Sequence, residues 1–466
     1  MAATPRGWAG VTRGRADPLL LNDASRLSPT RVWRHSMVTA QDDLLLAELR
    51  RLLAEAAAEG RPLVVGGARH SMGGQSLYPG ASAVTAASLV CDLDMPRRRC
   101  RVSAGARWKD VLPILDRAGL SVPVMQSNSD FSVGGTLSVN GHGWAVPYGA
   151  FASSVRSFRL LLADGTAVTC SAAQNPELFR AALGGYGLLG IVLDVDLDLV
   201  PNAALRPAFA RTDAQELASR LGAALDSPTL RMAYARLSVA PRSFLTDALL
   251  VTFDETDGSL TPLSSEDVRF FGLVSRTMLR AQTGSSAGKG LRWWAEAHLA
   301  SRLAPSSVSR NRLLAQPTSS LGDPGVGRTD ILHEYFLPLP RLPGFLDACR
   351  KIIPASGQDL LNVTLRYVAA DRTSLLSFAP EPRIAAVMLF SQALTAEAEQ
   401  AMRHATELLV GEALSIGGSF YLPYRLHARR DQVARAYPGL GEFLSVKRKH
   451  DPQNRFRNQL FDAYLD

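Results

Sequence analysis

Residues 64–75 read Val64-Val65-Gly66-Gly67-Ala68-Arg69-His70-Ser71-Met72-Gly73-Gly74-Gln75, and this stretch decides the fold. It leaves a short apolar segment, 63–65, that is typical of a β-strand and continues as a glycine-rich loop. Glycine allows positive φ and close approach of the backbone to a ligand, and successive N–H groups form a nest for an anion. We therefore expect a pyrophosphate group here. The alternative is a structural turn with one incidental histidine.

A second glycine-rich stretch weakens that alternative. It reads Ser127-Asn128-Ser129-Asp130-Phe131-Ser132-Val133-Gly134-Gly135-Thr136-Leu137-Ser138-Val139-Asn140-Gly141-His142-Gly143, and it again combines paired glycines, hydroxyl groups and a histidine. A third cluster, Leu183-Gly184-Gly185-Tyr186-Gly187-Leu188-Leu189-Gly190-Ile191, lies between a predicted helix and a predicted strand. The first two stretches lack both the G-x-G-x-x-G pattern of a Rossmann site and the G-x-x-x-x-G-K-[ST] pattern of a P-loop. A Rossmann site is therefore disfavoured, and a P-loop is excluded.

Short strands and helices alternate through the first 200 residues. Leucines at helical spacing predict a helix over 41–59, and the hydrophobic pattern predicts two more over 108–118 and 176–183. The predicted strands are 63–65, 83–90, 101–103, 156–162, 167–170 and 191–199. Beyond Pro201 the alternation becomes less regular, so we place a domain boundary near 202–206.

Composition and charge limit the class of protein. Of the 466 residues, 46% are hydrophobic and 20% are charged, which is typical of a globular protein. The net charge of +8 permits an acidic substrate or cofactor, and we expect no nucleic-acid partner. The four cysteines form no C-x-x-C pair, so we expect no metal. No apolar run reaches the roughly 20 residues of a membrane helix, and the N-terminus lacks the apolar core of a signal peptide, so we expect a cytoplasmic protein.

The three glycine-rich segments, in this order and at this spacing, resemble the FAD-binding domain of the vanillyl-alcohol oxidase / para-cresol methylhydroxylase (PCMH) superfamily. The resemblance covers roughly residues 30–205. It implies an α+β fold with two domains: a PCMH-type FAD-binding domain and a substrate domain built on an antiparallel sheet. We predict an extended lead-in over 1–30, the FAD-binding domain over 31–205, the substrate (cap) domain over 206–420, and a tail over 421–466 that returns to the FAD-binding domain.

The resemblance also implies which residues bind FAD. They belong to the glycine-rich segments or to the returning tail: Gly66, Gly67, Ala68, Arg69, His70, Ser71, Gly74, Gln75, Ser127, Ser132, Val133, Gly134, Gly135, Thr136, Ser138, Val139, Asn140, Gly141, His142, Gly190, Ile191, Tyr421 and Asn458. In members with a Gly-x-x-His-Ser type loop, the histidine is bonded to the flavin 8α-methyl group. Residues 67–71 fit that pattern, so we predict covalent FAD through His70. The alternative is that His70 only hydrogen-bonds the cofactor. A second covalent link would need a cysteine in 127–143, and none is present.

The C-terminal half resembles sugar-lactone oxidases and decaprenylphosphoryl-ribose oxidases, most clearly at 421–425 and 445–452. Residues 331–336 and 361–367 are predicted to be two strands of the sheet that, by family placement, roofs the flavin. Alternation places Glu334 with Phe336 on one face, and Asn362 and Thr364 with Arg366 on one face. A glutamate and an arginine above a flavin can hold a polyol by charge-assisted hydrogen bonds. The alternative is a cross-strand salt bridge without a catalytic role.

The resemblance implies oxidation of an alcohol group of a sugar, an alditol or a sugar lactone, with hydride transfer to flavin N5 and with O₂ or another molecule as the final electron acceptor. Such a reaction needs a base near the substrate hydroxyl. The candidates are Glu334, Tyr421 and His142, and either Arg366 or Arg425 would lower the pKa of the base or position oxygen atoms.

Two other functions remain as alternatives: oxidation of a C–N bond in the manner of cytokinin dehydrogenases, and a flavoprotein without turnover. Cytokinin dehydrogenases have an aspartate where this chain has Ser127, which counts against the first. An intact flavin cleft with polar roof residues counts against the second. Decaprenylphosphoryl-ribose oxidases have a lysine where this chain has Tyr424, which counts against a lipid-phosphate sugar as the substrate.

Much of the positive charge is concentrated in residues 270–313. This segment carries seven basic residues, one acidic residue, and the pair Trp293–Trp294. One interpretation is an interfacial lid that approaches lipid or an anionic substrate. The favoured interpretation is a solvated helical insert in the substrate domain.

Overall fold

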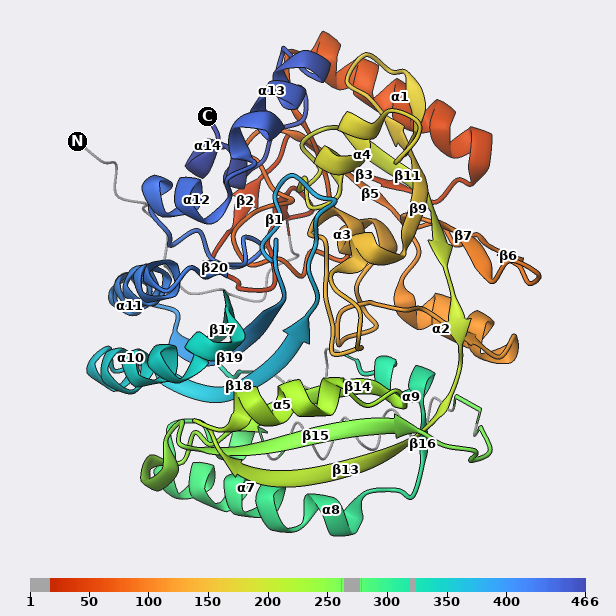
Figure 1. Ribbon diagram of the computed structural model, residues 1–466. Helices are drawn as coiled ribbons and strands as arrows, with labels where there is room; N and C mark the ends of the chain where they lie inside the picture. Colours follow the sequence, from red (N-terminus) through yellow and green to blue (C-terminus); the bar gives the residue numbers. More distant parts are fainter. Residues whose placement is uncertain (1–16, 261, 264–276, 278, 318–323) are drawn as a thin grey trace.

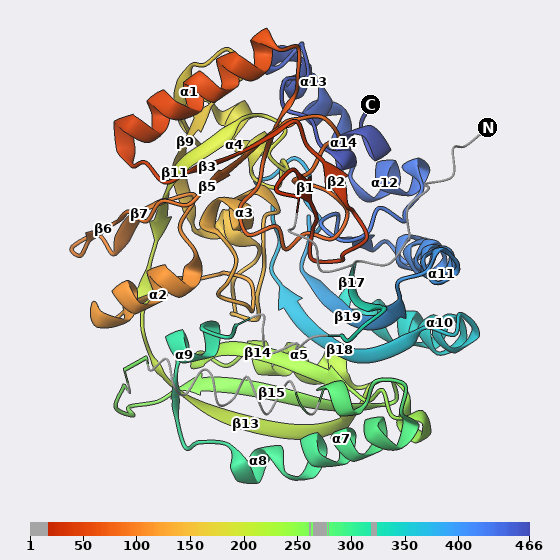
Figure 2. The ribbon, with the colours of Figure 1, turned by 180° about the vertical axis from the view of Figure 1, so that it is seen from behind.

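The computed structural model describes residues 17–466, with the exception of 261, 264–276, 278 and 318–323. The N-terminal lead-in up to residue 16, and the part of the basic segment at 270–276 and 278, lie outside the described residues. Figures 1 and 2 show two layers. The N-terminal elements and the C-terminal helices form one end of the molecule, and a large sheet with its helices forms the other.

The first layer begins with helix α1 (Asp42–Ala58), which buries Leu45, Leu49 and Leu52 on one side. It packs beside a parallel sheet in the order β3 (Arg34–Val38), β5 (Ser82–Ala86) and β4 (Leu63–Val65). The short pair β1 (Leu20–Leu21) and β2 (Thr30–Arg31) precedes it. Because β4 ends at Val65, the glycine-rich loop begins directly at the edge of this sheet.

A second, antiparallel sheet completes the N-terminal layer. Its order is β10 (Ala167–Ser171), β9 (Val155–Leu161), β11 (Ile191–Asp198), β7 (Arg99–Ser103) and β6 (Cys91–Asp94). The helices of this layer are α2 (Trp108–Arg117), α3 (Val133–Ser138) and α4 (Pro176–Ala182). Helix α3 differs from the sequence analysis, which treated 127–143 as a loop. The Ser132 hydroxyl accepts a hydrogen bond from the Gly135 N–H and so caps this short helix.

The second layer is an eight-stranded sheet in which every pair is antiparallel. Its order is β16 (Val308–Ser309), β13 (Ala204–Asp213), β15 (Asp247–Glu255), β14 (Leu230–Leu237), β18 (Asp359–Val368), β19 (Arg383–Ala393), β17 (Arg328–Leu337) and β20 (Ser419–Phe420). Helices α10 (Leu342–Ala355) and α11 (Ala396–Ser415) lie side by side at one end of this sheet. The remaining helices of this layer are α5 (Leu217–Leu225), α7 (Ser286–His298), α8 (Ala300–Leu303) and α9 (Arg310–Leu314).

The C-terminal segment returns to the first layer as α12 (Arg430–Ala436), α13 (Leu440–His450) and α14 (Gln459–Tyr464). A β-bridge joins Phe456 to Leu63 at the start of β4. This return brings residues 421–427 between the large sheet and the first glycine-rich loop.

The mixed helix and sheet character agrees with the sequence analysis. The division into 31–205, 206–420 and 421–466 stays a prediction, and one continuous apolar core extends from Cys100 to Leu465 across these ranges. In the part of the chain that the structure describes, no helix is long and apolar enough to cross a membrane.

Several basic side chains of residues 270–313 form ion pairs or hydrogen bonds within the protein, which the sequence alone did not indicate. Arg280 pairs with Asp330, Lys289 pairs with Asp359 at 2.7 Å, and Arg292 pairs with Glu296 at 2.8 Å. Arg310 is 2% exposed and donates to the backbone carbonyls of residues 122 and 123. Much of the positive charge within 270–313 is therefore neutralised or buried.

Candidate functional site

A large cavity lies where the glycine-rich segments meet the big sheet. It encloses about 1200 Å³ of empty space, including the part that is open to solvent. It is lined by Val65, Gly66, Gly67, Ala68, Arg69, His70, Ser71, Gln75, Ser76, Ala86, Ala104, Gly105, Gln126, Phe131, Ser132, Gly134, Gly135, Ser138, Val139, Tyr186, Gly187, Gly190, Ile191, Val192, Leu332, Tyr421, Pro423 and Tyr424.

Glycine at two positions allows the N-terminus of α3 to lie directly against the first loop and against the segment that follows β7. A Cβ atom at Gly67 would lie 2.0 Å from the Ser132 Oγ, and a Cβ at Gly134 would lie 2.8 Å from the Ala104 Cβ. Real Cβ atoms do not approach other atoms so closely, so any side chain here would force these segments apart.

His70 lies on this wall, half-buried, with its ring 4.6 Å from that of Phe131 between centroids. Burial lowers the pKa of His70, although the nearby charge of Asp130 opposes that effect. A neutral imidazole has a free lone pair, which is the form that can bond to a carbon atom.

The residues present fit a large polar cofactor. The Arg69 Nε and the Ser76 Oγ are buried at the cavity, and no described residue offers either atom a hydrogen-bond partner. Buried polar atoms are normally satisfied, so such atoms indicate a missing ligand or water. Together with the glycine-lined backbone, they suit the pyrophosphate and ring edges of a dinucleotide.

Most of the residues that the sequence analysis assigned to FAD line this cavity. Eight do not: Gly74, Ser127, Val133, Thr136, Asn140, Gly141, His142 and Asn458. Several of these hold the wall from behind. The Thr136 hydroxyl accepts from the Trp108 Nε1 at 2.8 Å, and Asn458 donates to the carbonyls of Gln75 and Tyr186 at 2.8 and 2.9 Å.

The sequence analysis missed other lining residues. Phe131, Tyr186 and Gly187 lie within the quoted glycine-rich stretches, so their position beside predicted cofactor residues could have identified them. Gln126, Leu332 and Pro423 carried no comparable signal.

Glu334 lies behind the cavity wall in a tight polar cluster. Its Oε1 is 2.5 Å from the His142 Nε2, and its Oε2 accepts a hydrogen bond from the Tyr424 hydroxyl at 3.1 Å. Glu334 and His142 are each 3% exposed, whereas Tyr424 and Tyr421 line the cavity. The Tyr421 hydroxyl instead donates to the Val139 carbonyl at 2.8 Å. Tyr424 therefore connects the cavity to the buried carboxylate.

The charges around Glu334 keep it ionised. Burial works against the carboxylate, but the charge and hydrogen bond of His142, the charge of Arg366 and the Tyr424 hydroxyl outweigh it and lower the pKa of Glu334. The Arg366 Nε is buried without a hydrogen-bond partner among the described residues. An ionised carboxylate behind a hydroxyl on the cavity wall can accept a proton.

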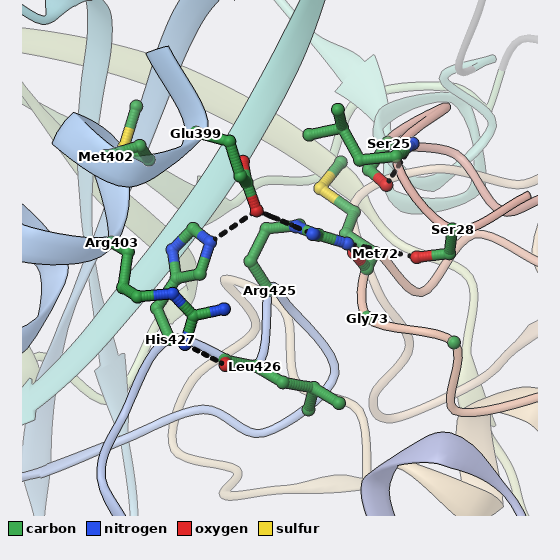
Figure 3. Close-up of polar contacts among 12 residues, drawn as sticks. Ser25, Ser28, Met72, Gly73, Glu399, Met402, Arg403, Arg425, Leu426 and His427 are labelled. Atoms are coloured by element: carbon green, nitrogen blue, oxygen red, sulfur yellow. Dashed lines mark hydrogen bonds and ion pairs between the residues drawn. The ribbon is translucent and has the colours of Figure 1, made fainter. Parts of the chain in front are cut away.

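Arg425 is not among the residues that line the cavity, and its guanidinium lies in a separate cluster with Glu399 and His427 (Figure 3). Its guanidinium donates to Glu399, to the Ser28 Oγ at 3.0 Å and to the Met72 carbonyl at 3.1 Å. The His427 Nε2 lies 2.8 Å from the same Glu399 oxygen. Burial opposes ionisation of Glu399, but His427 and Arg425 outweigh it and hold its pKa at about 2. Arg425 thus ties α11 to the first glycine-rich loop.

Metal ligands are absent from the described ranges, where no group of three or more His, Cys, Asp or Glu side chains could hold an ion.

Comparisons with known proteins agree with this geometry. Residues 46–171 match the FAD binding domain family. L-gulonolactone oxidase from Mus musculus is 29% identical over 42% of this chain and 44% of its own length. Alditol oxidase from a Streptomyces species is 34% identical over 24% of this chain and 26% of its own length. Cytokinin dehydrogenase 2 from Arabidopsis thaliana is 34% identical over 34% of this chain and 33% of its own length. The chain thus spans less than half the length of these relatives.

Proposed function

We propose that this chain, whose residues 46–171 match the FAD binding domain family, is an FAD-dependent oxidoreductase that oxidises an alcohol group of a sugar, an alditol or a sugar lactone. The observation that carries the proposal is the Tyr424–Glu334 pair, a hydroxyl on the cavity wall that is hydrogen-bonded to a buried carboxylate. The similarity to a gulonolactone oxidase and an alditol oxidase supports the substrate class.

When bound, FAD supplies the two-electron acceptor for a hydride from the carbinol carbon. The chain's own residues handle the proton. The substrate hydroxyl donates its proton to the Tyr424 oxygen as Tyr424 passes its own to Glu334, so the carboxylate acts as general base through one hydroxyl. His142 holds Glu334 in place from behind, and Arg366 keeps it ionised. Tyr421 forms part of the wall and leaves its hydroxyl on Val139.

The proposal includes covalent attachment of FAD through His70. The half-buried position of its imidazole on the cavity wall and its lowered pKa support this. After acid precipitation the pellet should stay yellow, and His70→Ala should release the colour to the supernatant. His35→Ala is a matched control, because His35 lies beside the same loop, 3.4 Å from Arg69. If the wild-type pellet is colourless and free FAD is found in the supernatant, His70 contacts the cofactor without a covalent bond.

The substrate class is tested by mixing the holoprotein anaerobically with a panel of alditols, sugars and sugar lactones. Bleaching of the flavin band by a polyol is the expected result, and repeating the reaction in air shows whether O₂ or another acceptor reoxidises the flavin. Bleaching by an isoprenylated adenine but by no polyol would replace the proposal with C–N oxidation. No bleaching by any compound would indicate a flavoprotein without turnover.

A further inference from the structure

Two arginines share the sheet face that carries Glu334. Across the sheet, Glu334 on β17 pairs with Val387 on β19, Val387 pairs with Thr364 on β18, and Thr364 pairs with Arg236 on β14. Arg366 lies two residues beyond Thr364 on the same face, because side chains of a strand alternate. The face therefore carries a carboxylate at one side and two guanidinium groups at the other.

Both arginines lack a carboxylate partner. Arg236 donates through Nη1 to the neutral side chains of Asn362 and Thr364, and the side chain of Arg366 makes no hydrogen bond to any described residue. Within the described ranges neither forms an ion pair. The nearby Arg292 differs, because Glu296 neutralises it at 2.8 Å.

The charge of Arg366 is unfavourable as it stands. Burial lowers the pKa of Arg366, and the positive charge of Arg236 lowers it further. Glu334 offsets only part of this, and its carboxylate is already paired with His142. Uncompensated charge in a half-buried place is costly, and a bound anion would relieve that cost.

Only short side chains separate the arginines from the reactive end. On β19, Val387 lies between Glu334 and Thr364, and Ala385 lies between Phe336 and Arg366. The backbones of β17 and β18 are two strand spacings apart, roughly 10 Å. A polyhydroxylated molecule that reaches from Tyr424 along this face would meet the arginines, which lie beyond the residues that line the cavity described above.

We propose that Arg236 and Arg366 form an anion subsite, which binds a carboxylate or phosphate group at the far end of a polyhydroxylated substrate. The inference rests on the proposed function, since it assigns the other end of the same substrate to Tyr424 and Glu334. Guanidinium groups bind carboxylates and phosphates bidentately through planar, charge-assisted hydrogen bonds. The preferred substrates are then sugar acids or sugar phosphates, not neutral alditols.

Binding can be measured without turnover. Holoprotein with its flavin pre-reduced under anaerobic conditions is titrated calorimetrically, at constant ionic strength, with D-sorbitol, D-gluconate, D-sorbitol 6-phosphate and inorganic phosphate. We expect at least one anionic polyol to bind about tenfold more tightly than sorbitol, and inorganic phosphate to compete with it. If D-gluconate binds more tightly than D-sorbitol 6-phosphate, the subsite prefers a carboxylate, and the reverse order indicates a phosphate.

Variants assign this preference to residues. Arg236→Gln and Arg366→Gln should each abolish it, and Arg236→Lys should retain part of it because the charge remains. Arg206→Gln is the control, because Arg206 is exposed on β13 of the same sheet and its loss changes the net charge equally. Retained flavin and an unchanged melting temperature verify folding.

Three results would overturn the anion subsite: equal affinity for all three polyols, no binding of any anionic probe, or a preference that survives in both glutamine variants. These results are distinct from failure of the proposed function. A polyol that bleaches the flavin without any anion preference defeats the subsite alone. Anion binding with no bleaching by any alcohol defeats the function and leaves the anion site.

Discussion

The protein contains two Glu–His clusters that look alike, one around the buried Glu334 and one around the half-buried Glu399, and they differ in what else contacts the carboxylate. In each, a glutamate lies within 3 Å of a histidine, at Glu334–His142 and at Glu399–His427. In the second cluster Arg425 hydrogen-bonds the carboxylate directly, and its remaining donors go to Ser28 and Met72 (Figure 3). In the first, Arg366 acts only through its charge, and the hydrogen bond comes from Tyr424 on the cavity wall.

We propose that this difference separates a structural cluster from a reactive one. A carboxylate with all its partners supplied by the chain stabilises the fold and has no capacity left for a ligand. A carboxylate whose partner is a hydroxyl on a cavity wall can exchange a proton with what enters. We therefore expect changes at Glu334 to affect the rate, and changes at Glu399 to affect stability.

The largest expected effect comes from Glu334→Gln, which keeps the size of the side chain and removes its basicity. The rate of anaerobic flavin reduction by the best polyol should fall by about 10²–10⁴-fold, the usual contribution of a general base. Tyr424→Phe should cause a loss of similar size, because it breaks the same proton path. A reduction rate within tenfold of wild type in both variants would remove Glu334 from the reaction.

Glu399→Gln should instead destabilise the protein. The pKa of Glu399 lies near 2, against an ordinary 4.5, which corresponds to about 3 kcal/mol of the free energy of unfolding at neutral pH. Chemical denaturation measures this loss, while the flavin reduction rate per folded molecule should change less than tenfold. A large rate loss with unchanged stability would reverse the roles of the two clusters.

The same cluster predicts a pH dependence. Because the pKa of Glu399 is lowered by folding, its carboxylate stabilises the fold fully above pH 4.5, and this contribution is lost as the pH falls from 4.5 towards 2. Denaturation midpoints of wild type and Glu399→Gln should therefore converge over that range. A constant difference between them at all pH values would show that Glu399 is not ionised in the folded protein.

The smallest effect is expected from Tyr421→Phe. The Tyr421 hydroxyl donates to a backbone carbonyl and not to Glu334, so its removal costs one hydrogen bond, about 1 kcal/mol. The reduction rate should fall about fivefold or less. A loss as large as that of Tyr424→Phe would make Tyr421 the proton acceptor instead.

Part of the cavity wall could be predicted from the sequence because its signal is local. Residues 66–71 line the cavity, and their glycines are required for close backbone contact whatever the rest of the chain does. Helix α3 was not predicted because a segment with two glycines in six residues has a low helix propensity. The hydrogen bond from the Gly135 N–H to the Ser132 hydroxyl stabilises this helix, and that contact is visible only in the structure.

The reactive cluster was only partly predictable. Alternation placed Glu334 on the right face, but its contact with Tyr424 joins residues 90 positions apart and depends on the return of the C-terminal tail. From the sequence, Arg425 was a candidate for tuning the base or positioning oxygen atoms, and Tyr424 was not among the candidates. Adjacent side chains diverge here, so that Tyr424 lines the cavity and Arg425 points into the Glu399 cluster.

The most direct test of the central claim is anaerobic single-turnover reduction of the bound flavin by an alcohol deuterated at its carbinol carbon. The account predicts that the flavin bleaches, that deuterium slows the bleaching in wild type, and that Glu334→Gln slows it far more than Glu399→Gln. Absence of bleaching with every alcohol, or equal rates in the two variants, would contradict it.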